Sequence, residues 1–279
     1  MVSFPLSPKA KRCGNGYIDC CPAHEDKEPS LSIGEGADGK LLLNCFAGCS
    51  FEEIILAAGL KGNQFKKGSE YPSSNAKQAS EVDRIAKALS IWKFTSPLKG
   101  TLAETYLRSR CINTWSDEMR FHPKLYFSDD STLRPAMVCL VRRNGKIVGV
   151  HRTFLSENGQ KLGKKMLGPC GGGTVYVGGK GSFLAVAEGI ENALSIRMMS
   201  GDRRGRFHAA LSASGISQLE LPKSVGDVMI FPDGDEVGIT AGYKLGQRAS
   251  LNGWNASTLL PPKGQDWNDK LITEMTDRL

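Results

Sequence analysis

Two stretches of the 279-residue chain decide the fold of its C-terminal part: AVAEGIENAL, residues 185–194, and VMIFPDGDEVG, residues 228–238. In each stretch an apolar run leads into acidic residues and a glycine, and a helical pattern comes next. This pattern predicts buried parallel strands at 183–187 and 228–231 that end in loops. In α/β sheets the functional side chains gather at such strand ends. We therefore expect the acidic residues after the two strands to lie close together.

These acidic residues are Glu188 after the first strand, and Asp233 and Asp235 after the second. Hard divalent cations prefer oxygen ligands, and they stabilise the charge that develops in phosphoryl transfer. The three carboxylates therefore predict a catalytic site for Mg²⁺ or Mn²⁺ that serves nucleotide or nucleic-acid chemistry. Taken alone, Asp-Gly-Asp is also typical of an ordinary turn, and that alternative stays open for the second stretch.

The order of these acidic motifs resembles the Toprim domain, which DnaG-type primases, topoisomerases and some nucleases share. Its signature is a Glu-Gly after one strand and an Asp-x-Asp after a later one. LSASGISQL, residues 211–219, fits the strand end with small residues that the family has between the two motifs. The resemblance implies an α/β Toprim domain with catalytic Glu188, Asp233 and Asp235.

The end of the chain extends this resemblance. PPKGQDWNDKL, residues 261–271, is similar to the Lys-Gly-x-Asp-x-Asn-Asp element that closes such domains. It implies that Asp266 and Asp269 approach the metal site, although a polar helix start uses the same residue types. Many primases carry a second acid four residues after the first Glu, where this chain has Asn192. Either Glu191 or no residue takes that role, so the number of metals stays open.

The N-terminal part carries two close pairs of metal-ligating residue types. Cys21 and His24 lie in CPAH, and Cys45 and Cys49 lie in CFAGC. Four soft or borderline ligands in two pairs are typical of tetrahedral Zn²⁺. The alternating segments between the pairs predict a β-hairpin with its turn at 37–40, as in a zinc ribbon. The alternative is that these are free thiols of a cytosolic protein.

The same stretch resembles the zinc-binding domain that opens DnaG-type primases, especially those of phages and plasmids. CPAHEDKEPSLSI, residues 21–33, and NCFAGCSFEEII, residues 44–55, carry the likeness. Cys20 competes with Cys21 as a ligand, and the Pro-x-His that follows Cys21 favours Cys21.

Charge and composition narrow the functional classes. The formal net charge is +7, and residues 134–165 hold eight Lys or Arg against one acid, Glu157. A concentrated basic segment indicates a phosphate-backbone partner, although a solvated surface is the alternative. We expect a cytoplasmic protein without membrane contact, because no apolar run of 18 residues and no signal-peptide pattern occurs. No P-loop motif occurs, so the chain contains no helicase motor of that type.

The basic segment predicts two strands within 134–155, joined by a tight turn at 142–145. Together with KKMLGP, residues 164–169, it is similar to a primase pattern of two strands and a Lys-aromatic-Leu-x-x-Pro element. The resemblance implies that Arg152 and Lys165 line the groove for template DNA and nucleotide phosphates. The chain departs from that pattern by a Met in place of the aromatic. Further basic residues expected on this surface are Arg142, Arg143, Lys161 and Lys164.

The predicted architecture is an α+β multidomain protein, a zinc ribbon followed by a primase core that contains the Toprim domain. We expect a zinc-ribbon domain at 1–60, a flexible polar linker at 61–80, a basic subdomain at 81–178 and the Toprim domain at 179–279. The linker prediction follows from its Ser, Gly and Lys content.

The resemblance implies a DNA primase of the phage or plasmid kind, acting in a bacterial host cell. It would synthesise short RNA primers during DNA replication with Zn²⁺ and Mg²⁺ as metals. The implied partners are a single-stranded DNA template, NTPs and a replicative helicase on a separate chain. The alternatives are a Toprim nuclease and a non-catalytic DNA-binding module. A topoisomerase would need a nucleophilic Tyr on a further domain.

Overall fold

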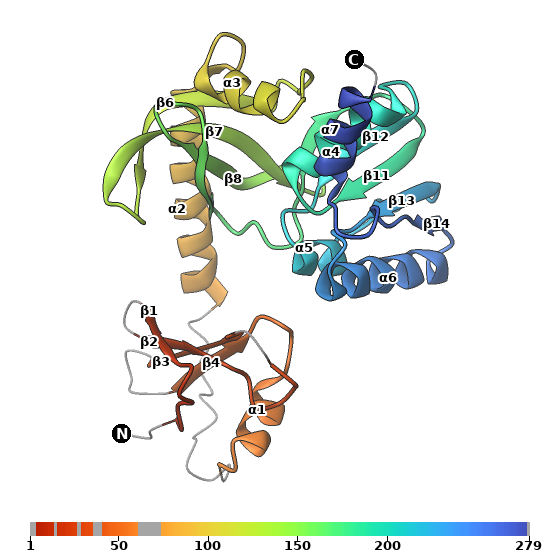
Figure 1. The fold of residues 1–279 in the computed structure, drawn as a ribbon. Helices are drawn as coiled ribbons and strands as arrows, with labels where there is room; N and C mark the ends of the chain where they lie inside the picture. Colours follow the sequence, from red (N-terminus) through yellow and green to blue (C-terminus); the bar gives the residue numbers. More distant parts are fainter. Residues whose placement is uncertain (1–3, 14–15, 27–28, 36–40, 61–73, 278–279) are drawn as a thin grey trace. The chain divides into compact units, whose positions relative to one another are not determined.

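The computed structural model describes two compact units, residues 1–77 and 78–279 (Figure 1). The residues described are 4–13, 16–26, 29–35, 41–60 and 74–277. The expected hairpin turn at 37–40 and most of the expected linker lie outside them. No helix among the described residues has the length and apolar character needed to cross a membrane.

The first unit is built on a four-stranded antiparallel sheet, the N-terminal sheet. Its strands, in spatial order, are β1 (Lys11–Cys13), β2 (Gly16–Asp19), β3 (Leu31–Glu35) and β4 (Leu41–Cys45). The predicted hairpin is confirmed, since β3 and β4 pair with Leu31 opposite Cys45. Helix α1 (Phe51–Ala57) follows and begins with a capping box between Ser50 and Glu53. Ile54 of this helix is fully buried in the small core.

The second unit begins with an antiparallel sheet, the middle sheet. Its helices are α2 (Ser74–Lys93) and α3 (Leu102–Ser109), and its strands are β5 (Ser96–Pro97), β6 (Met119–Phe127), β7 (Thr132–Arg143), β8 (Lys146–Leu155) and β9 (Lys161–Leu167). The predicted pair of strands is confirmed as β7 and β8. Their turn contains Asn144 and Gly145, both with positive φ, as a tight two-residue hairpin requires. Helix α2 begins inside the segment expected to be a linker.

The chain continues into a mostly parallel sheet, the C-terminal sheet. Its spatial order is β10-β12-β11-β13-β14. The strands are β10 (Val175–Gly178), β11 (Phe183–Ala187), β12 (Gly205–Ala209), β13 (Asp227–Phe231) and β14 (Asn255–Thr258). The helices are α4 (Ile190–Ser200), α5 (Ala213–Gln218), α6 (Glu236–Leu251) and α7 (Trp267–Thr276). Both strands predicted from the acidic motifs, β11 and β13, are present and parallel to each other.

Helices cover both faces of the C-terminal sheet, with α4 and α7 on one face and α5 and α6 on the other (Figure 1). Successive residues of β11 alternate between the two cores: Ala185 faces α4, and Val186 faces α6. A strand buried on both faces has an uninterrupted apolar sequence, which explains the run FLAVA. The core beneath α4 continues into the middle sheet through Met137 and Leu155. The middle and C-terminal sheets therefore share one core.

The opposite face of the middle sheet packs on α2. Ala88 of α2 is fully buried there, and Trp92 packs against the same core. The rings of Phe127 and Phe154 stack in this core with centroids 4.5 Å apart. The middle sheet is thus fixed on both sides, by α2 and by the core that it shares with the C-terminal sheet.

Gly149 in β8 offers a test of how closely β8 and β9 pack. A Cβ at Gly149 would lie 2.2 Å from the carbonyl oxygen of Leu167 and 2.6 Å from Sγ of Cys170. We predict that Gly149→Ala lowers the free energy of unfolding by about 1–3 kcal/mol, because the backbone must shift to make room. The control Gly171→Ala, where a Cβ meets nothing within 4 Å, should change it little. Urea denaturation measures both, and equal effects would contradict the prediction.

Candidate active site and candidate zinc centre

The pairing of β11 with β13 brings the first two acidic residues to one edge of the C-terminal sheet. Ala187 and Phe231 are register partners at the ends of these parallel strands. Glu188 follows one of them directly, and Asp233 follows the other after a single proline. Burial and the charges of Asp233 and Asp235 raise the pKa of Glu188 to about 7. The carboxylates therefore act on one another electrostatically.

Hydrogen bonds within the described residues do not satisfy all the carboxylate oxygens at this edge. Oε2 of Glu188 is buried without a hydrogen-bond partner. Burial, together with the charges of Asp266 and Asp235, also raises the pKa of Asp233, against the effect of a hydrogen bond from Asn192. A buried, unpartnered carboxylate oxygen beside other carboxylates suits a hard divalent cation. The donor set therefore fits Mg²⁺ or Mn²⁺.

The carboxylates are not drawn into a closed ligand cage. Among the described residues, one group of His, Cys, Asp or Glu is gathered closely enough to hold a metal ion, and it lies in the first unit. Asp235 is exposed and is the N-cap of α6, with Oδ1 accepting the N–H of Gly238 at 2.6 Å. Asp235 thus has a structural role as a helix cap, whereas Asp233 follows the strand end next to that of Glu188.

Asn192 holds Asp233 in place. Its Nδ2 donates to Oδ1 of Asp233 at 2.8 Å, and its Oδ1 accepts the N–H of Asn268 at 3.0 Å. These bonds join α4 and α7 to the end of β13. The sequence marked Asn192 only as a missing acid, whereas the structure makes it a positioning residue.

Glu191 is neutralised by neighbours from the middle sheet and α3. Its Oε1 accepts hydrogen bonds from Tyr106 and, at 2.7 Å, from Nζ of Lys161. Burial alone would raise its pKa, but the ion pair with Lys161 and the hydrogen bond from Tyr106 lower it to about 2. Because this charge is already paired, the arrangement favours a site without a second acid on α4.

The closing segment serves as the start of α7. Asp266 is its N-cap and forms a capping box with Asp269. The expected approach to the site is seen for Asp266, whose charge acts on Asp233. The backbone N–H and side chain of Asp269 are engaged with Asp266.

The basic residues of β8 and β9 divide between the two faces of the middle sheet. Lys164 is the register partner of Thr153, and Lys165 is the partner of Arg152. Neighbouring residues on a strand point to opposite faces, so Lys164 and Lys165 face in opposite directions. The charge of Lys164 lowers the pKa of both Glu188 and Asp233, so Lys164 is within electrostatic range of the candidate active site.

The other basic residues predicted for the groove have partners within the protein. Nζ of Lys165 lies 2.6 Å from Asp129, and the guanidinium of Arg152 lies over the Phe154 ring at 5.6 Å. The remaining two, Arg142 and Arg143, bond to Glu118 and to the Gly171 carbonyl.

Two further residues on the Lys164 face were not found by sequence reasoning. His151 and Thr153 are buried, and neither Nδ1 of His151 nor Oγ1 of Thr153 has a hydrogen-bond partner. Burial lowers the pKa of His151 to about 4, so its imidazole is neutral at physiological pH. An isolated His in a strand carries no spacing signal, so sequence patterns alone do not single out His151.

The zinc-ligand residues predicted from the two Cys-containing motifs come together in the first unit. Ligand atoms of Cys21, His24, Cys45 and Cys49 all lie within 4.8 Å of one another. Nδ1 of His24 is 3.3 Å from Sγ of Cys49. The Cys3His set is compatible with tetrahedral Zn²⁺.

Asp26 contacts two members of this ligand group. One of its oxygens, Oδ2, lies 3.7 Å from Nε2 of His24 and accepts the N–H of Cys21 at 2.7 Å. A carboxylate that orients a ligating His is a common second partner in zinc sites. Cys20 is not a member of the group.

Comparisons with known proteins assign the two halves of the second unit. The Toprim domain family matches residues 183–277, and a domain of unknown function, DUF7146, matches residues 82–177. The protein therefore contains a Toprim domain, and the segment before it, which includes the middle sheet, is similar to a family of unknown function. No curated protein matches the chain.

Solved structures similar to the chain are primases. The Aquifex aeolicus primase, with zinc-binding and RNA polymerase domains, is 18% identical with a TM-score of 0.43, over 96% of this chain and 78% of that one. A DNA primase domain from Pseudomonas aeruginosa is 16% identical with a TM-score of 0.43, over 71% and 77%. The primase fragment of the bacteriophage T7 primase-helicase protein is 15% identical with a TM-score of 0.39, over 91% and 95%.

The predicted resemblance to Toprim-containing, DnaG-type primases is thereby confirmed. It is supported by the match to the Toprim family and by the Cys3His group in the first unit.

The Cys3His group predicts a sharp difference between neighbouring cysteines. We expect Cys45→Ser to lose bound zinc, measured by mass spectrometry of metals in the purified protein, because a structural zinc site needs all four ligands. Cys20→Ser, a change next to the group but outside it, should retain one zinc per chain. Equal zinc content in both variants would contradict the assigned ligand set.

Proposed function

We propose that the protein is a DNA primase that synthesises short RNA primers on single-stranded DNA by divalent-metal-dependent nucleotidyl transfer. One observation carries the proposal: Glu188 and Asp233 follow adjacent strand ends, each raises the electrostatic demand of the site, and the charge of Lys164 in the middle sheet acts on both. Phosphoryl transfer requires carboxylates that hold a divalent cation and a nearby basic side chain that binds phosphates.

The proposed reaction needs no protein nucleophile. A Mg²⁺ or Mn²⁺ ion held by Glu188, Asp233 and Asp235 would supply charge stabilisation for the phosphates. Asn192 keeps Asp233 oriented, and Lys164 binds the NTP phosphates as a point charge. The primer 3′-hydroxyl attacks the α-phosphate, a new phosphodiester bond forms, and pyrophosphate leaves.

The rest of the chain serves template handling in this proposal. Basic residues of the middle sheet hold the DNA backbone: Arg152, Lys165, Arg142 and Arg143. The Cys3His group binds Zn²⁺ and keeps the first unit folded, so that its sheet can contact single-stranded bases. A replicative helicase on a separate chain, in a bacterial cytoplasm, completes the proposed setting.

A second candidate is a non-catalytic DNA-binding module. It is favoured by one observation, that the described carboxylates are not gathered into a metal-binding group. Loss of a carboxylate distinguishes the two candidates, because DNA binding alone would survive it.

The first test of the proposal is Asp233→Ala in a primer synthesis assay with mixed-sequence single-stranded DNA, Mg²⁺ and labelled NTPs. We expect products to fall by roughly 10²-fold or more, as when another charge-stabilising group is removed from an active site. Asp227→Ala, at the other end of the same strand β13, is the matched control and should stay active. If neither the wild type nor the variants make primers but all bind DNA, the binding module is the better assignment.

Adjacent lysines provide a second test. Lys164→Ala should lower kcat/KM for NTPs about tenfold to 100-fold, equivalent to about 1.5–3 kcal/mol for a hydrogen bond to a charged group. Lys165→Ala removes the same charge from the opposite face, and we expect it to weaken template binding with a smaller effect on NTP use. If Lys165→Ala lowered kcat/KM for NTPs more than Lys164→Ala does, the assignment of Lys164 to the NTP phosphates would be wrong.

A further inference from the structure

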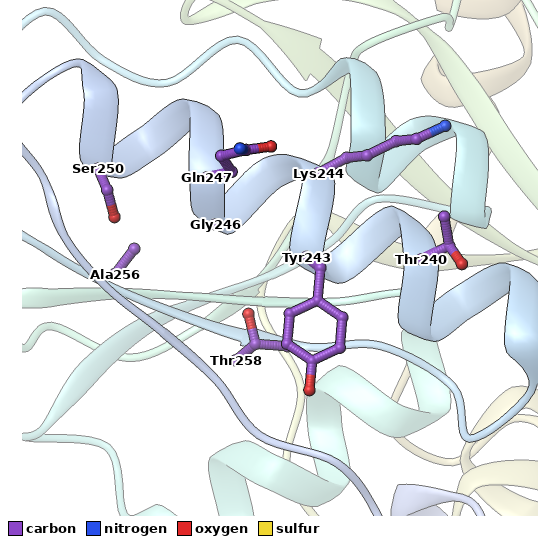
Figure 2. A pocket seen from close by; sticks show the side chains of 8 residues that line it. All are labelled: Thr240, Tyr243, Lys244, Gly246, Gln247, Ser250, Ala256 and Thr258. Atoms are coloured by element: carbon purple, nitrogen blue, oxygen red, sulfur yellow. The ribbon is translucent and has the colours of Figure 1, made fainter.

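A groove of about 640 Å³ lies beside β14 in the C-terminal sheet (Figure 2). One wall is a face of α6, and the other is the strand itself. The residues that line it are Thr240, Tyr243, Lys244, Gly246, Gln247 and Ser250 of α6, with Ala256 and Thr258 of β14. Its volume is in the range of about 300–1,000 Å³ that is typical of ligand sites. None of these residues belongs to the candidate active site.

The strand that forms one wall is an edge of the sheet. β14 pairs with β13 on one side, and no other described strand pairs with it. The N–H groups of Asn255 and Leu259 donate to β13 and its preceding loop, at 3.0 and 2.9 Å. Because backbone groups alternate along a strand, those of Ala256 and Thr258 point to the open edge. The two residues of β14 that line the groove thus offer unused donors and acceptors.

Helix α6 lies close to this edge because glycines face it. A Cβ at Gly246 would lie 3.1 Å from Oγ1 of Thr258, and a Cβ at Gly242 would lie 3.3 Å from Cγ2 of the same residue. The close approach brings the polar face of α6 alongside the open edge. An added strand lies about 4.8 Å from its neighbour, so it would run along the groove within reach of α6.

The lining chemistry favours a negatively charged occupant. Lys244 is the one charged side chain in the lining, and no carboxylate is among the lining residues. No ion pair of Lys244 is found within the described residues. Tyr243 is 57% exposed beside Thr258 and supplies an aromatic contact of the kind that is enriched at interfaces (Figure 2).

We propose that this groove binds an acidic, extended peptide segment of a partner protein, which adds to β14 as a further strand. The main-chain bonds of such an addition give affinity, and side chains above alternate positions give selectivity. Single-stranded DNA is also anionic, but it has no alternating N–H and C=O groups to match the strand edge. The proposal does not depend on primase activity.

The test is selection of a random heptapeptide library on the full-length protein, with counter-selection on the Lys244→Glu variant. We expect Asp- and Glu-rich peptides. A fluorescein-labelled copy of the most enriched peptide should bind in an anisotropy titration. Its affinity should fall at least about tenfold for Lys244→Glu, whereas Lys223→Glu, the same charge change at an exposed site away from the groove, should leave it unchanged.

The backbone pairing has its own test. Ala256→Pro removes an outward N–H without removing a bond to β13, so it should weaken the peptide while circular dichroism melting stays close to wild type. If that variant does not fold, the bound peptide is changed instead, by N-methylation of alternate backbone nitrogens. Methylation of the nitrogens that face β14 should abolish binding, and methylation of the nitrogens that face away should not.

Three outcomes would overturn the proposal. They are no enrichment over the counter-selection, equal affinity for all N-methylated peptides, and displacement of the peptide by a dT oligonucleotide whose own binding is lost in Lys244→Glu. The last outcome would assign the groove to nucleic acid. Primer synthesis by Lys244→Glu should equal that of the wild type, which separates this test from that of the proposed function.

Discussion

The parallel pairing of β11 with β13 is the constraint on which the candidate active site depends. It fixes Ala187 opposite Phe231, and the residues that follow these strand ends are Glu188 and Asp233. Two carboxylates held this close, one with a buried oxygen that has no partner, repel each other unless a cation or a proton intervenes. The backbone hydrogen bonds and the cores on both faces of the sheet hold them there. The stability of the sheet thus keeps the two carboxylates close together, although their mutual repulsion favours separating them.

The core shared by the middle and C-terminal sheets gives this carboxylate pair its positive counterpart. Lys161 and Lys164 both belong to β9, but they interact with different carboxylates. Lys161 neutralises Glu191 at the start of α4, while the charge of Lys164 acts on the two unpaired carboxylates. The same core therefore sets both the structural ion pair and the proposed phosphate contact.

The first unit follows a different principle. Its core is small, with Leu31 and Ile54 as the fully buried side chains. A small domain of this kind usually needs a metal or another cross-link for stability. The Cys3His group joins the loop after β2 to the end of β4 and the loop that follows it, and Asp26 lies 3.7 Å from Nε2 of His24. With Zn²⁺ bound, as we propose, this group would stabilise the unit and hold the hairpin of β3 and β4 in place.

Local patterns in the sequence determined the two central strands, the zinc-ligand residues and the Toprim signature, because each depends on residue types at short spacing. Tertiary structure alone decided which charges stay unbalanced. Glu191 and Glu188 are close neighbours in sequence, but only Glu191 accepts hydrogen bonds from Lys161 of β9 and Tyr106 of α3. Three further features could not be predicted from the sequence. They are the opposite orientations of Lys164 and Lys165, the hydrogen bond from Asn192 to Asp233, and the open edge of β14. Each is set by register and packing between segments that lie far apart along the chain, and such contacts leave no local pattern.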